Sequence, residues 1–371
     1  MRLPADNRLG AVMVVVSLLL ASCGSSSVEM PLTQPSATEL SPEPAPANVT
    51  IVPLTPRPAS ILRPRPPGPL DGDLIDATAE AGRCPDPFPE GHLLHGTETV
   101  IIDQANEVTP PTRLDATSFV ANAGLEEAIL DRLGDDGSRY AVLIKDLRDG
   151  SGASINAERL FYAASLFKLE VMFELFHQRE AGLIAFDERY IVSDYYAEFG
   201  LGPRLIAQCE EVSIERALGA MMSVSDNAAA VMLQDRAGPR HINASMRALG
   251  LRDTGLLADA LPITAADVAL LLEAIARGEA VSTNASQEML DLLATEKVDD
   301  RIASGVPEGT LLAHKTGNWE NATHDAGIVY GDKSTYIVVL LSDIGFDGDA
   351  GSVERDIMRI VWEWFEGEPQ E

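Results

Sequence analysis

The spacing of apolar positions predicts a helix and then a β-hairpin at the start of the main globular region. Residues 115–133 repeat apolar side chains at helical intervals, and Gly134 follows them, as is typical of a helix end. Residues 140–147 form a β-rich run, the turn 148–151 comes next, and residues 153–156 resume a strand pattern. This region is therefore expected to supply one helix and two paired strands.

The middle of the chain has a helical pattern. A helical lobe is expected over about residues 164–255, with helices at 214–222, 228–237 and 241–249. Thr264 to Asp267 form a capping arrangement that begins a further helix. The apolar side chains of that helix lie on one stripe, which indicates a buried face.

Strand patterns return near the end of the chain. Strands are expected at 311–316, 326–330 and 335–342, before a closing helix at 353–365 with one apolar face. Two early strands and three late ones predict a five-stranded antiparallel sheet, flanked by the first and last helices. The expected fold is α+β, with a cleft between the sheet and the helical lobe.

The first residues have the pattern of a signal peptide over 1–22. Arg2 and Arg8 precede the apolar run 11–21, which is too short for a comfortable permanent span. The run ends Leu-Ala-Ser before Cys23, similar to the lipobox of bacterial lipoproteins, which implies lipidation of Cys23. A plain secretory signal or an uncleaved anchor is the alternative.

The next segments have a different composition. Residues 23–83 are rich in proline and open with a Gly-Ser run, so they are interpreted as a disordered, semi-rigid tether. Residues 84–114 are an N-terminal extension in which 97–103 is a candidate strand. The main domain is assigned to 115–371. The expected location is extracytoplasmic, on a membrane-anchored lipoprotein.

Charge and histidine placement exclude several partner classes. The formal charge is −29, from 57 acidic and 28 basic residues, which argues against binding to nucleic acid or an anionic membrane surface. Membrane contact is expected only through the N-terminal lipid. The six histidines are scattered and no Cys-x-x-Cys occurs, so neither metal nor cofactor is expected. A monomer is expected.

With Cys23 lipidated, Cys84 and Cys209 remain as a pair outside the reducing cytosol. Such a pair indicates a disulfide, which would tie the N-terminal extension to the helical lobe. Two unpaired cysteines are the alternative.

Candidate chemistry begins at Ser165 and Lys168, which are three residues apart at the start of an apolar, helix-patterned run. That spacing puts the hydroxyl and the amine on one helix face, where a buried, deprotonated amine accepts the hydroxyl proton. A first-turn position also places free backbone N–H groups near developing negative charge. A Ser-x-x-Lys occurs by chance about once in a chain of this length, so the pair needs support.

That support comes from Ser225-Asp226-Asn227 and Lys315-Thr316-Gly317. Either tripeptide could be structural, the first as a helix cap and the second as a strand end. In this order with Ser165-x-x-Lys168, however, they resemble the penicillin-recognising serine hydrolases, and class A β-lactamases most. The resemblance covers roughly residues 115–366 and implies a β-lactamase/transpeptidase-like fold.

The resemblance also implies roles for these residues. Ser165 attacks the amide carbonyl, Lys168 is the base, and Ser225 carries a proton to the leaving nitrogen. The substrate is bound by Asn227, Lys315, Thr316 and Gly317, with Lys315 and Thr316 on the substrate carboxylate. The backbone N–H groups of Ser165 and Asn318 form the oxyanion hole.

Two departures from the class A pattern stand out. The segment 250–262 is short and lacks the Glu-x-x-x-Asn pattern that carries the deacylating glutamate, leaving Asp259 as the nearest replacement carboxylate. The next strand, at 324–327, reads His-Asp-Ala-Gly where many class A enzymes supply a basic residue for the substrate carboxylate. Acylation is expected to be intact, while deacylation lacks its usual base.

Three hypotheses follow for the function. The first is a lipid-anchored, class A-like β-lactamase that hydrolyses β-lactams through an acyl-enzyme on Ser165. The second is a D-Ala-D-Ala carboxypeptidase or penicillin-binding amidase or esterase, acting on peptidoglycan-type peptides with slow deacylation. The third is a non-catalytic binding lipoprotein of the cell envelope, against which the retention of four reactive side chains counts.

Overall fold

The structure is a computed structural model. Most of the residues that it describes belong to the strands and helices of the main domain. The described residues are 60–66, 74–75, 84, 109–114, 117–257, 260–346 and 348–367. They all belong to one compact unit, Pro56–Glu371. The predicted signal peptide, Cys23, the candidate strand at 97–103 and Asp259 lie outside the described residues.

The elements follow the predicted order, with short additions. The strands are β1 Val120–Ala121, β2 Tyr140–Asp146, β3 Ser151–Ile155, β4 Phe161–Tyr162, β5 Arg189–Ile191, β6 Glu211–Ser213, β7 Pro262–Ile263, β8 Leu311–Trp319, β9 Ala322–Tyr330 and β10 Thr335–Ser342. The helices are α1 Ala123–Leu133, α2 Phe167–Glu180, α3 Asp194–Glu198, α4 Ile214–Ser223, α5 Asn227–Ala237, α6 Pro239–Leu249, α7 Ala265–Arg277, α8 Thr283–Leu293 and α9 Ala350–Glu366.

Within the described residues the main sheet has six strands, in the order β1-β3-β2-β10-β9-β8. From β3 to β8, each strand is antiparallel to the next in this order, as predicted. The remaining strand, β1, pairs in parallel with β3, with Val120 opposite Ser151. The five-stranded prediction therefore missed a two-residue edge strand.

Pairing at this edge of the sheet also moves the start of the first helix from its predicted position. It was predicted from residue 115, but α1 begins at Ala123, because Asn122 caps it by accepting a hydrogen bond from the Leu125 N–H. Val120 and Ala121 pair with β3 instead of joining the helix. Strand pairing thus overrides the local helical pattern of these residues.

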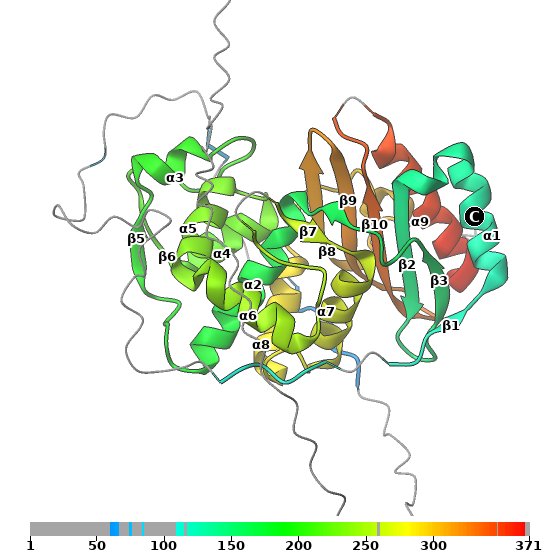
Figure 1. Cartoon of the computed structure of the whole chain (residues 1–371), viewed down its shortest axis with the longest axis horizontal. Coiled ribbons are helices and arrows are strands. Elements are labelled where there is room, and N and C mark those ends of the chain that lie inside the picture. The colour runs from blue at the N-terminus through cyan, green and yellow to red at the C-terminus, as the bar shows by residue number, and fades with distance from the viewer. Residues whose placement is uncertain are drawn as a thin grey trace, which may run out of the picture. The chain divides into compact units, whose positions relative to one another are not determined.

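Both faces of the sheet are covered, as Figure 1 shows, with α1 and α9 on one side and α7 on the other. Along β10, Ile337, Val339 and Leu341 pack on the α7 side, while Val338 and Leu340 pack on the side of α1 and α9. The two-residue period of a strand accounts for this alternation, and burial on both faces accounts for the continuous apolar run. The strand β8 remains at one edge of the sheet.

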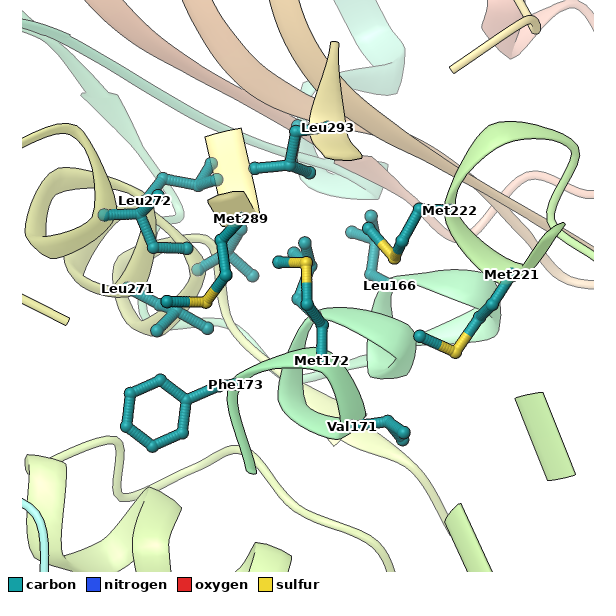
Figure 2. Packing of buried hydrophobic residues seen from close by; sticks show 14 of the residues in the cluster. Leu166, Val171, Met172, Phe173, Met221, Met222, Leu271, Leu272, Met289 and Leu293 are labelled. Carbon is teal, nitrogen blue, oxygen red and sulfur yellow. The ribbon is translucent and has the colours of Figure 1, made fainter. Parts of the chain in front are cut away.

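The helical lobe is built around α2. Figure 2 shows Met172 of this helix among side chains of α4 and α8, including Met222 and Met289, all of which are buried. The helix α8 was not predicted, although Ser282 caps it by accepting a hydrogen bond from the Ala285 N–H. With α7 and α8, the helical part of the fold extends past residue 255.

Part of the predicted tether packs on the domain. Ile61 and Leu62 lie against the core, and the Leu62 N–H donates to Ala276 O at 2.8 Å. The Arg65 guanidinium pairs with Asp291. Residues 60–66 therefore belong to the domain surface, because this short stretch carries apolar and cationic side chains between its prolines.

Cys84 and Cys209 form a disulfide across 125 residues of sequence, with their Cα atoms 5.1 Å apart. It ties the start of the N-terminal extension to the segment before β6. Of the helices that the structure describes, none combines the length and the apolar character needed to cross a bilayer.

Candidate active site

Ser165 lies in a 3-10 turn, Ala164–Leu166, that leads directly into α2. The backbone before it is held from two sides. The Ala163 N–H donates to Leu261 O at 2.7 Å, and Tyr162 O is 2.8 Å from Nε2 of His324. Ala164 has a φ of +45°, a left-handed conformation that side chains other than glycine rarely adopt. Such strain persists only where the surroundings enforce it, which is common at functional sites.

Lys168 is fully buried and its amine lies at the centre of the site. Nζ is 3.0 Å from Ser165 Oγ, 2.8 Å from Ser225 Oγ and 2.8 Å from Asn227 Oδ1. Burial lowers the pKa of Lys168 well below its usual value, and the positive charge of Lys315 lowers it further. A neutral amine in contact with a serine hydroxyl is a competent base for that hydroxyl.

Ser225 reaches this amine through an unusual backbone. Its φ is +60°, again in the left-handed region. The next residue, the buried Asp226, caps α5 by accepting from the Ala229 N–H, and its other oxygen accepts from Leu205 N–H at 2.8 Å. These bonds fix the turn from which Ser225 presents Oγ to Lys168.

Lys315, Thr316 and Gly317 lie on the edge strand β8, beside the turn that carries Ser165. A Cβ on Gly317 would lie 3.2 Å from Ala163 O and 3.4 Å from Ala164 Cβ. These contacts are tighter than most that a real Cβ makes, so glycine lets the two backbones approach without a shift of the neighbouring atoms. Asn318 follows on the same strand, which places its backbone beside the 3-10 turn of Ser165.

His324, on β9, and Arg301, in the segment before β8, are buried next to β8. The Ser342 N–H donates to Nδ1 of His324, so Nε2 carries the proton and donates to Tyr162 O. The Arg301 guanidinium donates to His324 O at 2.8 Å and to Gly317 O at 3.4 Å. His324 therefore supports the backbone before Ser165, and Arg301 is the buried cation next to the strand.

The burial of His324 predicts a pH-dependent stability. Burial lowers its pKa from 6.5 to about 4, so between these values the unfolded chain binds a proton that the folded chain does not. The unfolding free energy should fall by about 3 kcal/mol from this group as pH drops through that window. Urea unfolding at pH 7 and pH 4.5 should show a weaker pH dependence for His324→Gln than for the wild type. His241→Gln, remote from the site, is the control and should keep the wild-type dependence. An unchanged dependence in His324→Gln would contradict the assignment.

Sequence reasoning missed two residues that touch this motif, Glu296 and Arg301. Oε2 of Glu296 contacts the Lys315 ammonium and accepts from the Thr316 N–H and hydroxyl, each at 3.3 Å. Both side chains of the Glu296–Lys315 pair are fully buried. Neither Glu296 nor Arg301 lies in a recognisable motif, so the sequence carried no signal for them.

The short segment after α6 closes against the nucleophile's backbone. Asn243 holds it by exchanging two hydrogen bonds with the backbone of Leu256, and β7 pairs with β4 just before Ser165. Asp259, the predicted replacement carboxylate, is outside the described residues. Among those that are described, no carboxylate is hydrogen-bonded to Ser165.

The profile of the β-lactamase enzyme family matches residues 124–365, which is well over half of the chain. The chain belongs to the β-lactamase enzyme family. Its members' serine-based chemistry agrees with the group around Ser165, and the chain is a β-lactamase-like serine hydrolase. No curated protein matches it.

Solved structures share the family fold. PBP-A is 21% identical with a TM-score of 0.61, over 69% of this chain and 98% of its own. A β-lactamase from Sphaerobacter thermophilus is 24% identical with a TM-score of 0.61, over 67% and 99%. An ancestral class A β-lactamase is 23% identical with a TM-score of 0.58, over 65% and 100%. At these identities the likeness is one of fold, and it confirms the predicted β-lactamase/transpeptidase-like architecture.

Proposed function

We propose that this protein opens the amide bond of β-lactams by forming an acyl-enzyme on Ser165, and that it releases the product slowly. The single observation that carries the proposal is the buried Lys168 amine, which contacts both Ser165 Oγ and Ser225 Oγ. One group thereby reaches the attacking hydroxyl and the hydroxyl that would protonate the leaving nitrogen.

The acylation step follows from this geometry. Neutral Lys168 takes the proton of the Ser165 hydroxyl while Oγ bonds to the carbonyl carbon. The carbon–nitrogen bond then breaks, the Ser225 hydroxyl gives its proton to the nitrogen, and Lys168 returns a proton to Ser225. Backbone N–H groups of Ser165 and Asn318 are proposed to stabilise the negative oxygen.

Slow release is proposed because the second half-reaction needs a base for water. The class A pattern for that base is missing from residues 250–262. A mutant of PBP-A, a relative of the same fold, has been solved as an acyl-enzyme with penicillin G. That precedent supports testing for a long-lived acyl-enzyme here.

Burst kinetics test the proposal. Mixing the protein with a chromogenic cephalosporin at millimolar concentration should open one equivalent of substrate per protein and then continue slowly. Ser165→Ala should give no burst. A fast steady state without a burst would contradict slow release, and the absence of both burst and turnover with this cephalosporin and with its methyl ester would contradict β-lactam chemistry.

Lipid anchoring through Cys23 and an extracytoplasmic location remain part of the proposal. They are supported by the apolar run before Cys23 and by a disulfide of the kind that forms in oxidising compartments.

A further inference from the structure

The carboxylate of Glu296 is fully bonded within the protein. Its Oε1 accepts from the backbone N–H groups of Lys297 at 3.1 Å and Val298 at 3.2 Å. Its Oε2 contacts the Lys315 ammonium and both donors of Thr316. The side chains of Glu296 and Lys315 have no exposed surface. This carboxylate therefore has the hydrogen bonds and the counter-charge that a bound anion would need.

Lys315 and Thr316 are the donors that the family resemblance assigns to a substrate carboxylate. In this protein an internal carboxylate already uses the Lys315 ammonium, the Thr316 hydroxyl and the Thr316 N–H. A substrate carboxylate at the same place would meet the negative charge of Glu296 at short range. Like charges in contact in a poorly hydrated site repel strongly.

Glu296 is also held in place by its backbone. It lies three residues after the end of α8, and the next residue, Lys297, donates its N–H to Ser223 O at 2.9 Å. The segment thus joins the end of α4, just before Ser225, to the strand β8. Removing one partner of a buried ion pair is costly, so the Glu296–Lys315 pair is expected to persist when substrate arrives.

We propose that Glu296 is a specificity-determining residue that fills the anion subsite formed by Lys315 and Thr316. The substrates it favours carry an uncharged group, such as an amide or ester, where typical β-lactams carry a carboxylate. The inference rests on the proposed acylation of Ser165, and it names the class of substrate for that same site.

The test compares an acid with its neutral ester. Acylation rates of the full chain would be measured by intact-protein mass spectrometry with benzylpenicillin and with its methyl ester. The wild type should be acylated by the ester at least as fast as by the acid. Glu296→Ala should raise the acid-to-ester rate ratio by about 10- to 100-fold, because Lys315 becomes free to bind the acid. The ratio cancels any effect that the lost charge has on the base Lys168.

Two further variants complete the design. Glu296→Gln keeps the volume of the side chain, removes the charge and should raise the ratio in the same direction. Asp299→Asn removes an exposed charge three residues away and should leave the ratio unchanged. An equal rise of the acid-to-ester ratio in Glu296→Gln and Asp299→Asn would reveal a long-range charge effect and overturn the assignment to Glu296.

The two failures are distinguishable. If acid and ester both acylate Ser165, and the ratio in both Glu296 variants equals that of the wild type, the specificity role is overturned and the acylation stands. Acylation of the wild type by the acid at least tenfold faster than by the ester also overturns the specificity role. If neither compound acylates the wild type or any variant, the proposed function fails and the specificity role falls with it.

Discussion

Replacing Lys168 with methionine is expected to slow acylation of Ser165 by about 10³-fold, within the range that a positioned general base contributes. The amine is 3.0 Å from Ser165 Oγ, and among the described residues it is the hydroxyl's hydrogen-bond partner. Methionine has a similar length and no charge, so it fills a similar volume without taking a proton. Acylation by a penicillin, followed by quenched mass spectrometry, measures the loss.

Lys168→Arg separates the role of the base from that of the charge. The guanidinium keeps a positive charge and cannot be deprotonated in proteins, so this variant should lose acylation as severely as the methionine variant. Denaturant unfolding of both variants controls for folding. Acylation within tenfold of the wild type in either folded variant would contradict the assignment of Lys168 as the base.

The second large effect concerns Ser225, where activity and backbone strain are coupled. Both Ser225→Ala and Ser225→Gly remove the hydroxyl that lies 2.8 Å from Lys168, and each should slow acylation by about 100-fold. Their stabilities should differ, because only glycine adopts a φ of +60° without steric cost. The glycine variant should unfold with a free energy about 1 kcal/mol higher than the alanine variant.

The comparison uses two variants that share the same chemical loss. Acylation rates report the proton relay, and urea unfolding reports the strain. Equal stability of the two variants would show that the left-handed conformation at residue 225 costs nothing. Acylation at the wild-type rate in either variant would remove Ser225 from the proton path.

The sequence was sufficient to predict the elements with a strong apolar pattern. The apolar run at 335–342 and the capped helix beginning at Thr264 agree with β10 and α7, because burial of both strand faces or of one helix stripe leaves a strong pattern. The proximity of Ser165 and Lys168 follows from helical spacing. Their proximity to Ser225 and Lys315 came from the family resemblance, since those residues are far apart in the chain.

Other features depended on tertiary contacts that local patterns do not encode. The start of α1 at Ala123 is decided by the pairing of β1 with β3, although residues 115–122 also suit a helix. The positive φ angles at Ala164 and Ser225 lack the glycine that usually marks them. Glu296 is one of 57 acidic residues, and its contact with Lys315 depends on the path of the chain between α8 and β8.

The charges and the burial around Lys168 explain why its amine is suited to act as a base. Burial and the neighbouring Lys315 lower its pKa, while the negative charges of Asp226 and Glu296 raise it. Glu296 therefore has two effects on the site. It occupies the donors of Lys315 and Thr316, and it partly offsets the influence of Lys315 on the base.

Peptide mapping of the acylated protein tests the central claim most directly. The full chain would be mixed with benzylpenicillin or its methyl ester, digested, and analysed by tandem mass spectrometry over time. The account predicts a long-lived adduct of the whole opened β-lactam on the peptide that contains Ser165, and no adduct in Ser165→Ala. An adduct at another residue, or none from either compound, would contradict it.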